Sequence, residues 1–114
     1  MPQSEDDLDA WVRRILQENK NLNFVQRILE PKQWPTMTLP SGHGASHLMS
    51  WAENEKGPFV YPTIIYDKET RSLKQLEARQ AVRHALSTGE FIPFPDAAQA
   101  DLFSKEYKRV WGKQ

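Results

Sequence analysis

Two extended runs in the middle of the chain constrain its fold more than any other feature. Residues 46–53 and 59–66 have strand-like composition, and the turn-forming sequence Asn-Glu-Lys-Gly-Pro at 54–58 separates them. This pattern predicts an antiparallel pair of strands joined by a tight turn. Pro62 lies inside the second run. Because proline has no backbone N–H to donate, we expect an edge strand or a bulge at that position.

Helical patterns lie on both sides of this pair. Ser4 and Asp7 resemble a capping box, and apolar residues then recur at helical spacing, which predicts a first helix over residues 5–18. Similar spacing predicts a short helix that Pro31 ends, a helix over 76–87 and a last helix capped by Asp96. With a third strand at 72–75, the chain is expected to be α+β: an antiparallel meander of about three strands packed against three to four helices.

The length of the chain and one polar break predict its domain organisation. A chain of 114 residues has the size of one domain. The acidic first helix ends in Asn19-Lys20-Asn21, which predicts a boundary near residues 19–23. We therefore expect residues 1–20 to form an amphipathic helix beside an α+β domain at 21–114. That domain should keep its fold when the helix is removed.

The composition excludes several classes of function. Fifteen basic and 15 acidic residues give a formal net charge of zero. Proteins that bind nucleic acid or membrane surfaces usually carry a basic excess, so we expect neither kind of partner. The chain has no cysteine, which excludes disulfides and thiolate metal sites. The N-terminus is acidic, unlike a signal peptide, and no run approaches the roughly 18 apolar residues that span a bilayer.

A glycine-rich turn before the first strand holds the residues with the most chemistry. His43 and His47 are four apart, but Gly42 and Gly44 indicate a turn, and a zinc site would need a third ligand. We therefore expect no metal and no cofactor. Ser46 precedes His47, yet the Gly-x-Ser-x-Gly elbow of many hydrolases is absent. The chain is predicted not to be an enzyme, and a small hydrolase using Ser46 and His47 is the alternative that these residues leave open.

Several motifs follow one another in an order that resembles a known module. They are Phe-Val-Gln-Arg-Ile-Leu-x-Pro at 24–31, Pro-Ser-Gly…Ser-His-Leu-Met at 40–49, Tyr-Pro-Thr-Ile at 61–64, Thr-Gly-Glu-Phe-Ile-Pro-Phe at 88–94 and Ala-Asp-x-Phe-Ser-x-x-Tyr-Lys at 100–108. As a set they resemble a small module that recurs in virion-associated and internal virion proteins of tailed bacteriophages and prophages. The resemblance covers about residues 22–111 and leaves the first helix outside. It implies a virion context and no known enzymatic activity.

These observations together predict a non-enzymatic, phage virion-associated structural or protein-binding module. Its partners would be other virion proteins or a second copy of the chain, with a host protein as the alternative, in a virion or in the host bacterial cytoplasm. Buried aromatic residues dominate interface energies, so the expected contact residues are Leu8, Trp11, Ile15 and Trp34.

A second interpretation stays open. The chain would then be a small phage protein that acts in the host by blocking or sequestering a defence factor or a small-molecule signal. In that case we expect His43, His47 and Thr63 to line the ligand site.

Overall fold

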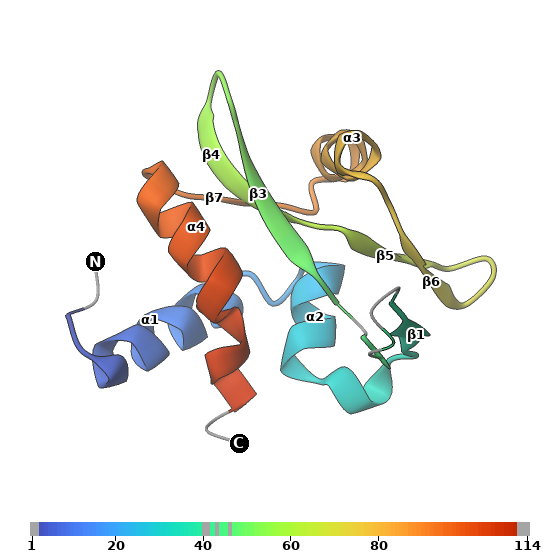
Figure 1. The fold of residues 1–114 in the computed structure, drawn as a ribbon, viewed down its shortest axis with the longest axis horizontal. Helices are drawn as coiled ribbons and strands as arrows, with labels where there is room; N and C mark the ends of the chain where they lie inside the picture. The colour runs from blue at the N-terminus through green and yellow to red at the C-terminus, as the bar shows by residue number, and fades with distance from the viewer. Residues whose placement is uncertain (1–2, 40–41, 43, 46, 112–114) are drawn as a thin grey trace.

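The computed structural model describes residues 3–39, 42, 44–45 and 47–111 and confirms an α+β fold (Figure 1). The elements in chain order are α1 (Glu5–Glu18), α2 (Asn23–Leu29), the 3-10 helix η1 (Pro31–Gln33), β1 (Met37–Thr38), β2 (Gly44–Ala45), β3 (Met49–Asn54), β4 (Gly57–Pro62), β5 (Ile64–Asp67), β6 (Ser72–Gln75), α3 (Ala78–Thr88), β7 (Ile92–Pro93), α4 (Ala97–Glu106) and the 3-10 helix η2 (Tyr107–Trp111). No helix in this described part of the chain combines the length and the apolar character needed to cross a membrane.

The hairpin of β3 and β4 is tighter than the sequence indicates. Asn54 pairs with Gly57, so only Glu55 and Lys56 form the turn. The Asn54 side chain accepts a hydrogen bond from the Lys56 backbone N–H at 2.9 Å, and Gly57 takes a φ of 114° that favours glycine. The expected five-residue turn is therefore wrong, because both of its ends belong to the strands.

The second strand-like run divides at Thr63, so its residues belong to two different antiparallel sheets. The Thr63 backbone N–H donates to the Leu48 carbonyl at 2.9 Å, and its own carbonyl accepts from the Leu76 N–H at 2.8 Å. The chain then leaves β4 and pairs as β5 with β6 in a separate two-stranded sheet, while β7 extends the first sheet to the order β3-β4-β7. β7 pairs only with Phe59 and Val60, so Pro62 lies beyond this outer ladder, where proline is tolerated.

Helices cover both faces of β4. Neighbouring residues of a strand point to opposite faces. Val60 accordingly joins the main core, whereas Phe59 and Tyr61 pack with Ala81 and Ala85 of α3. The main core lies under α1, α2 and α4, and its fully buried side chains are Val12, Leu16, Phe24, Val25, Ile28, Val60, Ala100 and Phe103.

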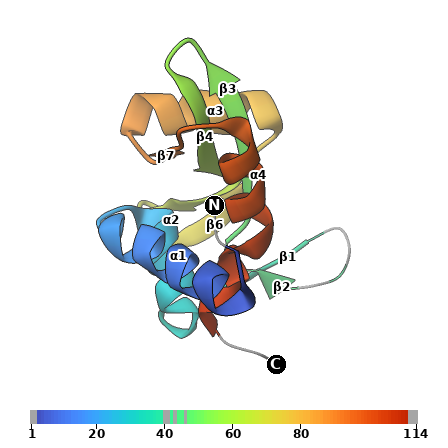
Figure 2. The same ribbon diagram turned by 90° about the vertical axis from the view of Figure 1, so that its left-hand side faces the viewer.

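The α1 helix is part of this main core and has the bounds that the sequence predicts. Val12 and Leu16 are 0% exposed and contact the same buried cluster as α2 and α4. The helix also lies beside η2, where Arg109 Nε donates to Asp9 Oδ1 at 2.6 Å (Figures 1 and 2). That residues 21–114 fold without α1 stays a prediction from the sequence. The packing of α1 favours the opposite result, in which the domain needs this helix to fold.

Removing the α1 contacts should destabilise the whole domain. Leu16→Ala should lower the free energy of unfolding by about 2–5 kcal/mol, the usual cost of emptying a buried leucine site. A chain of residues 21–114 should lose its cooperative thermal transition. Arg13→Ala, at an exposed position of the same helix, is the matched control and should change stability by less than ~0.5 kcal/mol. A wild-type melting temperature for residues 21–114 would restore the separate-helix interpretation.

Candidate functional site

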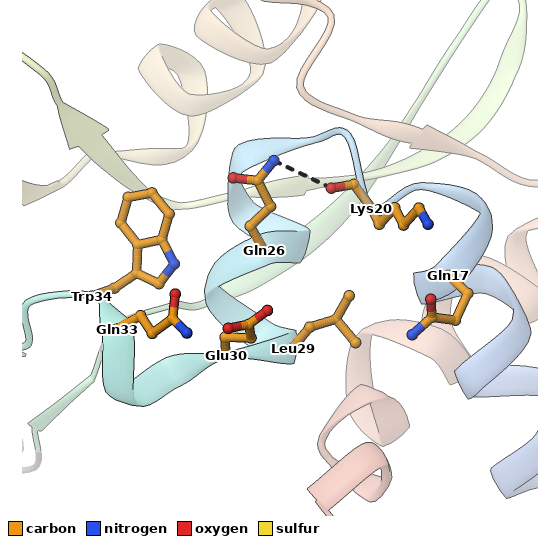
Figure 3. Close-up of a pocket in the computed structure, with 7 residues that line it drawn as sticks. All are labelled: Gln17, Lys20, Gln26, Leu29, Glu30, Gln33 and Trp34. Carbon is orange, nitrogen blue, oxygen red and sulfur yellow. Dashed lines mark hydrogen bonds between the residues drawn. The ribbon is translucent and has the colours of Figure 1, made fainter.

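One groove in the described part of the chain lies beside Trp34. We call it the Trp34 groove; its volume is about 450 Å³, and it is lined by Gln17, Lys20, Gln26, Leu29, Glu30, Gln33 and Trp34 (Figure 3). Its walls come from the end of α1, the outer side of α2, and η1. Figure 3 shows Trp34 and Gln33 on one side of α2 and Gln17 and Lys20 on the other.

The local sequence explains why Trp34 projects beside α2. The helix ends at Leu29, and Pro31 starts a short 3-10 turn instead of continuing it. This turn carries the chain back along α2, and Trp34 follows in an extended conformation with φ −120° and ψ 151°. Its ring contacts Tyr66 of β5 edge-to-face at 5.1 Å, a favourable aromatic geometry. The ring is therefore held in place while part of it stays exposed.

Amide side chains dominate the chemistry of the groove. Three glutamines supply both N–H donors and carbonyl acceptors, and a peptide group presents the same two functions. Gln26 is partly fixed, since its Nε2 donates to the Lys20 carbonyl at 3.2 Å. Lys20 and Glu30 add one charge of each sign, and Leu29 and Trp34 add apolar surface. The groove therefore combines hydrogen-bond donors and acceptors, one charge of each sign and apolar surface.

The other expected contact residues lie elsewhere. Trp11 packs against the rings of Phe94 and Phe103, with centroid distances of 6.2 and 6.0 Å. Leu8 and Ile15 are likewise partly buried against the main core. The structure therefore separates Trp34 from the other three residues, which lie on α1 and pack this helix against the main core. Sequence reasoning missed Gln17, Gln26 and Gln33, because exposed glutamines carry no distinguishing pattern.

His47 belongs to the core in the structure. Its Nδ1 lies 3.0 Å from the Tyr107 hydroxyl, and the two residues are only 6% and 3% exposed. Burial, with Lys108 and Arg27 nearby, lowers the pKa of His47 to about 4, and burial raises the pKa of Tyr107. The imidazole is therefore neutral at pH 7.

The residues named for a ligand, metal or hydrolase site are only partly described. His43 and Ser46 lie outside the described residues, so their arrangement with His47 and Thr63 stays a prediction. Among residues 3–39, 42, 44–45 and 47–111, no three His, Cys, Asp or Glu side chains come close enough together to hold a metal ion. His47 and Thr63 do not line the Trp34 groove.

Comparison of the chain with protein families, curated proteins and solved structures gives no match. The phage resemblance therefore depends on the ordered motifs of the sequence alone.

Acid should destabilise the fold through His47. Its pKa of about 4 in the folded chain lies below the ordinary value of 6.5, so the unfolded chain binds more protons between these values. Stability should be complete above pH 6.5 and should fall as the pH drops towards 4, by up to ~3 kcal/mol. Denaturant unfolding at several pH values measures this slope.

The control for this slope is a comparison of two histidine variants. His47→Gln should remove the slope between pH 6.5 and 4, whereas His84→Gln, on the partly exposed α3, should leave it in place. An unchanged slope in His47→Gln would show that other groups cause the acid sensitivity.

Proposed function

We propose that this chain is a non-enzymatic protein-binding module, associated with a phage virion, that holds an extended segment of its partner in the Trp34 groove. The observation that carries this proposal is the meeting of Trp34 with three glutamines in a groove of about 450 Å³. The partner is another virion protein or a second copy of the chain, and a host protein is the alternative.

The groove chemistry supports a protein segment as the ligand. An extended chain leaves its own N–H and C=O groups unpaired, and glutamine amides can bond both. Tryptophan gives a large apolar contact at a small entropic cost, which makes it a frequent anchor of interfaces. The groove has one lysine and one glutamate, and the whole chain has zero net charge. Binding should therefore depend on shape and hydrogen bonds more than on long-range charge attraction.

The surroundings of His47 support the non-enzymatic part of the proposal. A hydrolase orients its catalytic histidine with a carboxylate and leaves the other ring nitrogen to the nucleophile. Here Nδ1 is next to the phenol of Tyr107, inside the core. The virion context is supported by the ordered motifs that resemble the phage module, and by nothing else.

Trp34→Ala and Trp11→Ala should have opposite effects on association and stability. Trp34→Ala should weaken association at least roughly thirtyfold, which corresponds to ~2 kcal/mol, and should change the melting temperature little. Trp11→Ala should lower the free energy of unfolding by about 2–4 kcal/mol, because its ring packs on the core. The measurements are the solution mass of the purified chain, alone and mixed with purified virion proteins, and the thermal transition.

A third variant separates the groove from the Trp34–Tyr66 contact. Gln33→Ala removes one amide from the groove and leaves both rings in place, and it should weaken association without changing stability. The proposal fails if the wild type is monomeric and binds no virion protein, or if Trp34→Ala associates as the wild type does.

A further inference from the structure

The outer edge of β3 carries no other strand in the described part of the chain, and we propose that two copies of the protein pair along it as a closed antiparallel dimer. β3 is one edge of the β3-β4-β7 sheet. In Figures 1 and 2, α4 lies on one face of this sheet and α3 on the other, and no described helix or strand runs along β3 on the side away from β4. This edge is separate from the Trp34 groove and goes beyond the proposed function.

The pairing of β3 with β4 determines which backbone groups point to this edge. Along a strand of an antiparallel ladder, residues whose N–H and C=O groups bond the partner alternate with residues whose groups point away from it. The Leu48 carbonyl accepts from the Thr63 N–H at 2.9 Å, so the even-numbered residues of this segment face β4. The backbone groups of Met49, Trp51 and Glu53 therefore point to the outer edge.

Two prolines of β4 agree with this assignment. Pro62 lies opposite Met49, and Pro58 lies opposite Glu53. A proline has no N–H to donate, so it fits a position opposite a residue whose groups point away. In the part of the chain that the structure describes, the backbone hydrogen bonds outside helices and ladders involve none of Met49, Trp51 and Glu53. Their N–H and C=O groups can therefore bond a further strand.

β3 lacks the features that protect the other described edges. Proteins keep edge strands from pairing by making them short or by placing lysine or proline on them. β1, β2 and β7 have only two residues each, and β7 includes Pro93. β6 has four residues and carries Lys74. β3 has six residues, and residues 49–52 include neither a charge nor a proline. Its length and composition therefore favour pairing.

The same strand of a second copy is complementary to this edge. When the two β3 strands run antiparallel with Trp51 opposite Trp51, Met49 of each copy faces Glu53 of the other. Every outward N–H and C=O group of these three residues then has a partner. This register places no like charges opposite each other and forms a cross-strand aromatic pair, and both features are favourable. A two-fold axis at Trp51 closes the assembly at two copies.

α4 adds charge complementarity beside the paired strands. This helix contacts both β3 and β4, so the two α4 helices lie on the same face of the joined sheet. Asp101 of α4 forms a salt bridge with Lys105 at 2.9 Å and accepts a hydrogen bond from Trp51 Nε1 at 3.1 Å. A second copy across the two-fold axis therefore meets both signs of charge next to Trp51 and presents the same two charges in return.

The solution mass of the purified chain over a range of concentrations tests this pairing. At ~0.1 mM the chain should have the mass of a dimer, and dilution should return it to a monomer, because pairing along one strand buries little surface. Glu53→Pro removes an outward N–H and keeps the groups that face β4, and it should weaken the dimer at least about tenfold. Glu53→Ala keeps this N–H and should leave the dimer unchanged. A monomer at ~0.1 mM, or equal effects of the two substitutions, would overturn the proposal.

Amide hydrogen exchange tests the same edge without a substitution. Exchange at Met49, Trp51 and Glu53 should slow as the concentration rises, because the dimer bonds their N–H groups. The N–H groups of Ser50 and Ala52 face β4 and should exchange slowly at every concentration. If exchange at the three outward positions does not change with concentration, the copies do not pair along β3, even if the chain is a dimer.

The dimer and the Trp34 groove fail separately. Glu53→Pro should break the dimer and keep binding in the groove. Trp34→Ala should keep the dimer and lose only the mass that binding in the groove adds. The thermal transition of each variant shows whether it is folded, so a change in mass can be assigned to its own surface.

Discussion

The small size of the β3–β4–β7 sheet is the constraint on which the rest of the structure depends. An isolated hairpin is at best marginally stable in water, and β7 adds only two residues to it. Both faces of β4 must therefore be covered by helices. α3 covers the face of Phe59 and Tyr61, while α1, α2 and α4 together cover the face of Val60.

This dependence explains which parts of the fold could be predicted from the sequence. The bounds of α1 and the caps at Ser4 and Asp96 follow from local patterns, and the structure confirms them. The division at Thr63 does not, because it depends on hydrogen bonds to Leu48 and Leu76, which are distant in sequence. The packing of α1 into the core is equally non-local. A polar break such as Asn19-Lys20-Asn21 can follow a separate helix or a packed one, so it does not distinguish the two.

The candidate sites were harder to predict than the fold, because their residues are brought together by contacts between segments that are distant in sequence. Trp34 attracts notice as a tryptophan beside a proline, but the glutamines of its groove come from three elements and have no motif. A second cavity, which Arg27, Tyr66 and His84 help to line, forms where β5 passes between α2 and α3, and no local pattern in the sequence indicates it.

The Trp34–Tyr66 contact places the two cavities on either side of one aromatic pair. Trp34 lines the groove, Tyr66 lines the second cavity, and their rings meet at 5.1 Å. A ligand in the second cavity would lie beside the ring against which Trp34 packs. Coupling between binding sites is reciprocal, so any effect of a ligand in the second cavity on a segment held in the groove would be matched by an equal effect of that segment on the ligand. The size of that coupling is limited by the conformational entropy that the Trp34–Tyr66 pair has when both cavities are empty. Only entropy that the first ligand removes can lower the entropic cost of binding the second.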